Sequence, residues 1–106
     1  MTMHTISATD LKNLLDTGRA YLLDVRTAEE LEEAALPGAL HIPLHELPSR
    51  HVELPRDKPI AALCHHGVRS ETAARFLDKA GFVDTMSVAG GIDAYSLTVD
   101  AAVPRY

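Results

Sequence analysis

The chain contains a single cysteine, Cys64, and the residues around it could make this thiol a nucleophile. The segment Cys-His-His-Gly-Val-Arg, residues 64–69, joins a short apolar run to a helical pattern. A turn at the start of a helix gathers backbone N–H groups around one point, with the positive end of the helix dipole behind them. Such surroundings favour the thiolate form of a cysteine. We therefore expect Cys64 to be largely ionised at neutral pH and partly open to solvent.

The residues after Cys64 fit one small anion pocket. Gly67 permits the positive φ angle that a tight turn needs. Arg69 brings a planar guanidinium group to the rim, which suits an oxyanion such as a sulfonate or a phosphate. The other binding residues that we expect here are His65, His66, Val68 and Ser70. The histidine amides should line the pocket, while the histidine side chains stand at its mouth.

The same residues could instead have purely structural roles. A free cysteine is most often a buried packing residue, and Arg69 could be an ion-pair partner that holds the loop in shape. The combination of Gly67, Arg69 and a helix start favours a reactive thiol. A metal site is disfavoured, because Cys64, His65 and His66 are consecutive and no further cysteine or paired histidine stands at ligand spacing. We therefore expect no metal and no organic cofactor.

Polar residues elsewhere are assigned to structure. Asp24 and Arg26 are expected to form an ion pair that ties a strand end to the next loop, with a catalytic acid and a substrate clamp as the alternative. Gly90 and Gly91 indicate a tight turn, since the third glycine or the lysine of a nucleotide-binding loop is missing. Four glutamates are expected on a solvated helix face: Glu29, Glu30, Glu32 and Glu33.

The apolar pattern alternates between strands and helices. Strands are predicted near residues 5, 22, 40, 61 and 86. Helices are predicted after Ser7, from Thr27 to just before Pro37, from Arg69 to Gly81 and over 92–97, with one helical turn across 44–50. This order predicts an α/β fold with a mostly parallel five-stranded sheet and helices on both faces. Ligands of such sheets bind beyond the carboxyl ends of the strands, where Cys64 falls.

Length and composition limit the possible functions. The 106 residues fit one domain, 1–106, with a core of its own. Ten basic residues against fifteen acidic ones give a net charge of −5, which argues against binding to nucleic acid or to an anionic membrane. One cysteine cannot form an internal disulfide, so a reducing compartment is expected. With no cationic, apolar leader and no membrane-length apolar run, a soluble cytoplasmic protein is predicted.

The Cys-X-X-Gly-X-Arg loop of residues 64–69, which leads into a helix, resembles the active-site loop of the rhodanese sulfurtransferases, whose cysteine becomes a persulfide. Dual-specificity phosphatases of the same fold carry one more residue between cysteine and arginine. The family's other motifs resemble residues 21–26 (Tyr-Leu-Leu-Asp-Val-Arg), 36–39 (Leu-Pro-Gly-Ala) and 89–95 (Ala-Gly-Gly-Ile-Asp-Ala-Tyr). Ala34, Ala35 and Tyr95 depart from the usual Gly-His and Trp, which concerns local packing more than chemistry.

The resemblance covers nearly the whole chain and implies a rhodanese-like three-layer fold and sulfurtransferase activity. Cys64 would take sulfane sulfur from thiosulfate or a persulfide and pass it to a thiol or to cyanide, while Arg69 steadies the oxyanion of the donor. One alternative is a carrier module that relays sulfur between protein partners. Another is a phosphatase or arsenate reductase of the same fold, against which the short loop argues.

Overall fold

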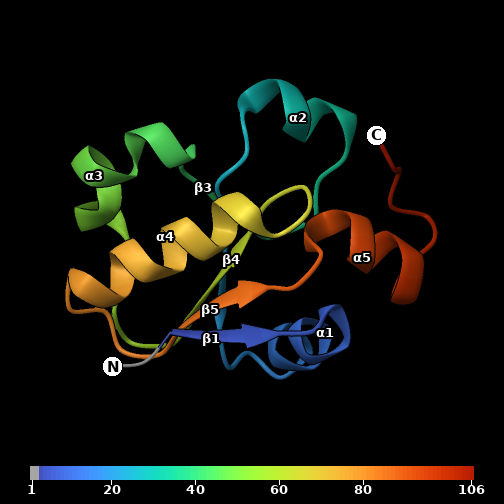
Figure 1. Ribbon diagram of the computed structural model, residues 1–106. Helices are drawn as coiled ribbons and strands as arrows, with labels where there is room; N and C mark the ends of the chain where they lie inside the picture. Colours follow the sequence, from blue (N-terminus) through green and yellow to red (C-terminus); the bar gives the residue numbers. More distant parts are fainter. Residues whose placement is uncertain (1–2) are drawn as a thin grey trace.

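The computed structural model describes residues 3–106 and contains a five-stranded sheet in the order β1-β5-β4-β2-β3 (Figure 1). The strands are β1 (Met3–Ile6), β2 (Tyr21–Asp24), β3 (Leu40–His41), β4 (Ile60–Leu63) and β5 (Thr85–Val88). Neighbouring strands run parallel throughout this sheet. The predicted α/β fold with a mostly parallel sheet is confirmed. The expected domain 1–106 also includes residues 1 and 2, which lie outside the described residues.

Helices cover both faces of the sheet and give the fold three layers (Figure 1). They are α1 (Ala8–Asp16), α2 (Ala28–Glu33), α3 (Leu47–Arg50), α4 (Val68–Lys79) and α5 (Gly91–Thr98), with 3₁₀ turns η1 (Leu44–Glu46) and η2 (His51–Glu53). Helices α1 and α5 pack on one face, and α3 and α4 on the other. Within residues 3–106, none of the helices has the length and apolar character needed to cross a membrane.

Strand β4 lies inside the sheet and is buried on both faces, which accounts for its unbroken apolar sequence. Its side chains alternate between two cores, as the pleat of a strand requires. Ala61 and Leu63 join the cluster under α1 and α5, whereas Ile60 and Ala62 join the cluster under α3 and α4. Cys64, the next residue, continues the alternation and belongs to the α3/α4 side. The strand therefore delivers the thiol to a packed position at its carboxyl end.

The predicted helix starts are present in the structure. The Ser7 hydroxyl accepts a hydrogen bond from the Asp10 N–H at 3.0 Å and caps α1. At α2, Thr27 and Glu30 form a reciprocal capping box, in which each side chain accepts a hydrogen bond from the backbone N–H of the other residue. Helix α4 ends at Lys79, just before Gly81, whose φ angle is +93°. Local capping chemistry therefore sets these boundaries.

Two predicted boundaries are wrong. Helix α2 ends at Glu33, because Ala34 is extended (φ −162°, ψ 141°), buries its side chain and turns its carbonyl to the Arg26 guanidinium at 2.8 Å. The single turn predicted across 44–50 is instead a chain of short helical segments that continues from Leu44 to Glu53. In both regions tertiary packing, which a local pattern does not report, decides where the helix ends.

Candidate functional site

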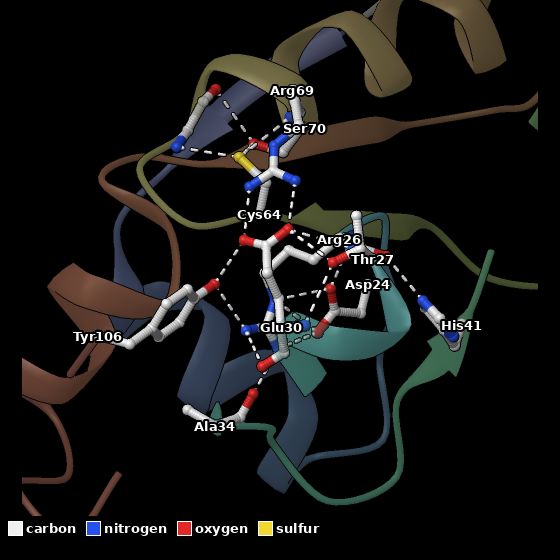
Figure 2. A network of polar contacts seen from close by, with 11 residues as sticks. Asp24, Arg26, Thr27, Glu30, Ala34, His41, Cys64, Arg69, Ser70 and Tyr106 are labelled. Carbon is white, nitrogen blue, oxygen red and sulfur yellow. Dashed lines mark hydrogen bonds and ion pairs between the residues drawn. The ribbon is translucent and has the colours of Figure 1, made fainter. Parts of the chain in front are cut away.

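Backbone and hydroxyl groups surround the sulfur of Cys64. Its Sγ accepts hydrogen bonds from the N–H of Gly67 at 3.0 Å and of Ser70 at 3.3 Å. The Sγ also lies 3.4 Å from the Ser70 hydroxyl, which in turn is 2.7 Å from the hydroxyl of Ser87 on β5. Figure 2 shows Cys64 and Ser70 together at the head of the site. The turn before α4 thus forms a cradle of donors around one sulfur atom.

The expectation of a partly open thiol is wrong. Cys64 is 1% exposed, and Ser70 is fully buried beside it. The reason is the alternation of β4, which points the cysteine into the α3/α4 core, where Ala73 and Leu77 of α4 belong to the same cluster. The amides that reach Sγ belong to Gly67 and Ser70. The structure therefore combines a packed cysteine with a donor cradle, so the two roles open to Cys64 do not exclude each other.

Two glycine segments hold the loop in this shape. Gly67 has φ +108°, and a Cβ added there would lie 3.1 Å from the backbone nitrogen of Gly90. The first amides of α5 also hold the loop, since Ile92 N–H donates to the Cys64 carbonyl at 2.9 Å and Asp93 N–H donates to the His65 carbonyl at 3.2 Å. The turn predicted from the two glycines at 90 and 91 is therefore also the clamp that fixes the start of the cysteine loop.

Gly91→Ala is expected to disturb the loop strongly. A Cβ at this position would overlap the carbonyls of Cys64 and His65, so the clamp and the cysteine could not both keep their places. Gly18→Ala is the matched control, because Gly18 has a similar φ (+66° against +61°) and open space around its Cβ position. We expect the control to cost roughly 1–2 kcal/mol of unfolding free energy, and Gly91→Ala about 2 kcal/mol more. Urea unfolding of both variants measures this, and equal losses would contradict the clamp.

The guanidinium of Arg69 is already bound by a carboxylate. Its Nη1 and Nη2 lie 2.6 and 2.9 Å from the two carboxylate oxygens of Glu30, in a two-pronged ion pair (Figure 2). The expected free oxyanion clamp is therefore not what the structure shows, and the alternative of a structural pair fits it. The expectation that Glu30 lies on a solvated face is also wrong, since its side chain is only 20% exposed.

Electrostatics around Glu30 favour its charged form. The hydrogen bonds from Arg69 lower the pKa of Glu30 strongly, and those from Tyr106 and the Thr27 N–H add to this effect. Partial burial acts in the opposite direction and is outweighed. The same ion pair raises the pKa of Arg69. Both groups therefore remain charged at neutral pH.

Asp24 and Arg26 form a fully buried ion pair, as expected for a structural role. Arg26 Nη2 lies 2.6 Å from Asp24 Oδ2 and Nε lies 2.9 Å from Oδ1, and both side chains are 0% exposed. Burial would lower the pKa of Arg26, but hydrogen bonds with Asp24 and Tyr106 outweigh it and raise the pKa. The guanidinium also donates to the Ala34 carbonyl and to the Tyr106 hydroxyl at 2.9 Å. This pair thus joins β2, α2 and the C-terminal segment.

Tyr106 connects the buried pair to the rim. Its hydroxyl accepts from Arg26 and donates to Glu30 at 2.8 Å, so that one hydrogen-bonded chain runs from Asp24 to Arg69 (Figure 2). The Tyr106 ring stacks on the His65 ring with centroids 3.9 Å apart. The packing of the C-terminal segment onto the body thus extends to the cysteine loop.

The two loop histidines differ in exposure. The His66 side chain is 63% exposed at the mouth of the loop, as expected. His65 is not at the mouth, since its ring is stacked between those of His66 and Tyr106. Its Nε2 is buried and has no hydrogen-bond partner among residues 3–106. Val68, the first residue of α4, is 78% exposed beside them. The loop therefore presents His66 and Val68 outward, while His65 supports it from within.

A third polar side chain approaches these histidines. Ligand atoms of His65, His66 and Asp93 lie within 4.8 Å of one another, a grouping that the sequence spacing did not reveal. The Asp93 carboxylate is also held by Arg105 at 2.8 and 3.3 Å, and this contact lowers its pKa. Because an arginine already occupies the carboxylate, we keep the expectation that the site needs no metal, which stays a prediction.

Comparison with known proteins adds a family to this geometry. Residues 7–98 match the family model described as a rhodanese-like domain. The chain belongs to the rhodanese-like domain family. The comparison supports the resemblance carried by the cysteine loop.

Several relatives of this rhodanese-like domain are similar over most of the chain. YtwF of Bacillus subtilis, a proposed sulfurtransferase, is 35% identical over 90% of this chain and 92% of its own length. YrkF of the same organism, a proposed sulfur carrier protein, is 42% identical over 82% of this chain, which spans about half of YrkF (48%). Thiosulfate sulfurtransferase GlpE of Pseudomonas savastanoi pv. phaseolicola is 34% identical over 74% of each chain.

A solved structure shows the same fold. The crystal structure of a rhodanese-related protein from Thermoplasma volcanium superposes with a TM-score of 0.83 at 33% identity, covering 91% of this chain and 93% of that one. The rhodanese-like three-layer arrangement expected from the motifs is therefore confirmed.

The rhodanese-like site contains three residues that sequence reasoning missed. They are Glu30, which is predicted on a solvated face, Ser87, which falls in a predicted strand, and Tyr106, for which the sequence predicts no role. Glu30 did carry a signal as the acidic partner of the Thr27 capping box, which fixes the direction of its side chain. For the other two, only the assembled fold reveals the contact.

Two cavities flank the rhodanese-like sheet at opposite ends. One of about 280 Å³ lies beside the rim of the cysteine loop and is lined by Val25, Thr27, Pro43, Leu44, His45 and Arg69. The other, of about 330 Å³, is lined in part by Pro59 and Asp84, which precede β4 and β5, and so lies at the amino ends of these strands. Only the first is placed to receive a molecule that reacts near Arg69.

Proposed function

We propose that this rhodanese-like chain is a sulfurtransferase that carries sulfane sulfur as a persulfide on Cys64. The observation that carries the proposal is the donor cradle at Sγ, formed by the amides of Gly67 and Ser70. The Ser70 hydroxyl lies beside it as the acceptor of the thiol proton. Two amide donors can hold a sulfur anion without any cation in contact with it. Relatives named as sulfurtransferases add support.

The first half-reaction loads the sulfur. The Cys64 thiolate attacks the outer sulfur of thiosulfate, a new S–S bond forms, and the original sulfur–sulfur bond breaks with its electron pair leaving on sulfite. The products are a Cys64 persulfide anion and sulfite, so charge is conserved and no oxidant is required. The terminal sulfur can then accept hydrogen bonds from the loop amides. Because Cys64 is 1% exposed, the loop has to open by a small displacement to admit the donor.

Two serine hydroxyls can change their hydrogen bonds when the sulfur gains or loses its proton. In the structure Sγ donates its proton to Ser70 Oγ, and either oxygen of the Ser70–Ser87 pair can act as the donor to the other. Once the thiol proton has passed to solvent, the Ser70 hydroxyl can leave the Gly67 carbonyl, to which it donates at 3.1 Å, and donate to the thiolate instead. The thiol and thiolate forms are thus both satisfied within the same buried site.

The second half-reaction unloads the sulfur. A thiolate or cyanide attacks the terminal sulfur of the persulfide, and the Cys64–S bond breaks with its electron pair returning to Cys64. With cyanide the product is thiocyanate, and with a thiol it is a new persulfide. The cavity beside Arg69 offers room for the body of a donor or an acceptor. The single free cysteine fits a reducing, cytoplasmic setting for this cycle.

Intact mass after incubation with thiosulfate tests the proposal. A gain of one sulfur, about 32 Da and reversible by cyanide, is expected on the wild-type chain. Peptide mapping should place the added sulfur on Cys64. No gain with either thiosulfate or cysteine persulfide as donor would remove the proposed intermediate.

A relay role is the second candidate, and the similarity to YrkF favours it. In this case the chain takes sulfur from a partner protein and presents it to another, and the exposed His66 and Val68 would meet that partner. Slow turnover with small donors but rapid uptake from a protein persulfide would favour the relay.

Hydrolysis of an aryl phosphate without sulfur transfer would instead favour the phosphatase alternative, which the short loop opposes.

A further inference from the structure

The arginines around the cysteine loop are already neutralised. Within residues 3–106, three arginine–carboxylate pairs surround it: Arg26 with Asp24, Arg69 with Glu30, and Arg105 with Asp93. Three positive and three negative side chains cancel, so these pairs leave no net positive charge for an incoming anion. The attraction for a donor must then come from the amides and hydroxyls that face the sulfur.

The pair at the rim is the one that a donor would meet. The Arg69 side chain is 35% exposed and its partner Glu30 is 20% exposed, whereas the Asp24–Arg26 pair is fully buried. Arg69 also lines the cavity beside the loop. An oxyanion arriving there would find each terminal nitrogen of Arg69 already donating a hydrogen bond to a carboxylate.

Glu30 is held in place from several directions. Its Oε2 accepts from the Tyr106 hydroxyl at 2.8 Å, and its Oε1 accepts from the Thr27 N–H at 3.2 Å, in addition to the contacts with Arg69 (Figure 2). To release Arg69, the carboxylate would have to break these contacts as well. The anion position on Arg69 is therefore filled by the protein itself.

The charge of the donor determines how strongly the neutralisation of Arg69 affects loading. Thiosulfate brings two negative charges toward a thiolate, whereas the persulfide of a small thiol such as cysteine brings one. Repulsion grows with donor charge, and a neutralised arginine cannot offset it. The fixed carboxylate of Glu30 adds a further unfavourable contact for the dianion.

We propose that Glu30 is a specificity-determining residue that keeps Arg69 neutralised and so favours thiol persulfides over thiosulfate as sulfur donors. This inference rests on the sulfur transfer proposed above. In the favoured reaction the Cys64 thiolate attacks the outer sulfur of R–S–S⁻, the donor S–S bond breaks, and its electron pair leaves on RS⁻. The outer sulfur becomes the terminal atom of the Cys64 persulfide, and no oxidant or reductant is consumed.

The test compares two donors in the loading step. Wild-type protein is mixed with thiosulfate or with cysteine persulfide, quenched at short times and read by intact mass, which gives a second-order loading constant for each donor. The ratio of the thiosulfate constant to the cysteine persulfide constant is the quantity of interest. Glu30→Gln should raise this ratio at least about fivefold, because Arg69 regains an unpaired charge. Glu29→Gln, on the exposed side of the same helix, removes the same charge and should change the ratio less than about twofold.

A double-variant cycle separates charge from structure. Arg69→Gln alone leaves Glu30 unpaired at the rim and should lower the ratio, while the Glu30→Gln/Arg69→Gln double variant restores neutrality and should return the ratio to near wild type. A merely structural pair would instead slow loading from both donors alike. The expected order of ratios is Glu30→Gln highest, wild type and the double variant in the middle, and Arg69→Gln lowest.

Several outcomes would overturn the inference. One is an unchanged ratio in Glu30→Gln, and another is a parallel change in both donors. If Glu30→Gln does not fold, the loading ratios of Arg69→Gln and of the double variant are compared instead. A lower ratio in Arg69→Gln supports the inference, and equal ratios overturn it. If neither folds, faster loading of the wild type by thiosulfate than by cysteine persulfide counts against the inference, and slower loading supports it. Absence of any added sulfur on Cys64 would instead refute the proposed function itself.

Discussion

Replacing Cys64 by serine is expected to abolish sulfur transfer, lowering the rate at least about 10³-fold. A serine hydroxyl can take up the hydrogen bonds that now reach Sγ, so the fold should persist, but an oxygen cannot form the persulfide. The measurements are steady-state transfer from thiosulfate to cyanide and the gain of sulfur by intact mass. Residual transfer above a few per cent of wild type would show that another group carries the sulfur.

Ser70→Ala is the matched control for this substitution. It removes the hydroxyl that lies 3.4 Å from Sγ while leaving the thiol and both amide donors in place. We expect a loss of about 3- to 10-fold in the loading rate, in keeping with one lost hydrogen bond to the sulfur. This variant must still gain one sulfur on Cys64. A complete loss in Ser70→Ala would mean that the hydroxyl, rather than the amide cradle, carries the chemistry.

Asp24→Asn is expected to lower the free energy of unfolding by about 3–5 kcal/mol, the range for breaking a buried ion pair from one side. The reason is that Arg26 would keep its charge at 0% exposure without a counter-charge. A domain of this size has about 5–15 kcal/mol in total, so the variant would lose a substantial share of its stability. Equilibrium unfolding in urea, monitored by circular dichroism, gives the value.

An exposed ion pair on α1 provides the control for this effect. Lys12 and Asp16 lie 2.7 Å apart, nearly the same separation as in the buried pair, but their side chains are 49% and 58% exposed. Asp16→Asn should therefore cost less than about 1 kcal/mol. If Asp16→Asn and Asp24→Asn lower the free energy of unfolding by similar amounts, the burial of the Asp24–Arg26 pair adds nothing to the cost of breaking it.

Much of the fold could be predicted because its signals are local. The continuous apolar run at β4 and the helix pattern after Arg69 lie next to each other in the chain, so the turn between them could be placed from sequence. The Thr27–Glu30 capping box lies within one helical turn, and its hydrogen bonds are those that the spacing predicts. The cysteine loop could be singled out because it falls at such a junction.

The partners of the loop could not be predicted, because they come from distant parts of the chain. Glu30 precedes Arg69 by 39 residues, and Tyr106 follows Glu30 by 76. Nothing in the residue types tells a solvated glutamate on α2 from one that turns toward the start of α4. The burial of Cys64 depends in the same way on its place in the core shared with α4. Sequence reasoning therefore singled out Cys64 and its loop but not the charges around them.

The tight packing around Cys64 also shields the thiol from unwanted oxidation and alkylation. Peroxides and alkylating reagents attack cysteines according to their thiolate character and their access from solvent. With 1% of Cys64 exposed, a bulky electrophile meets a closed surface. The packing that holds the loop thus guards the only thiol of the chain against irreversible conversion to sulfinic or sulfonic acid.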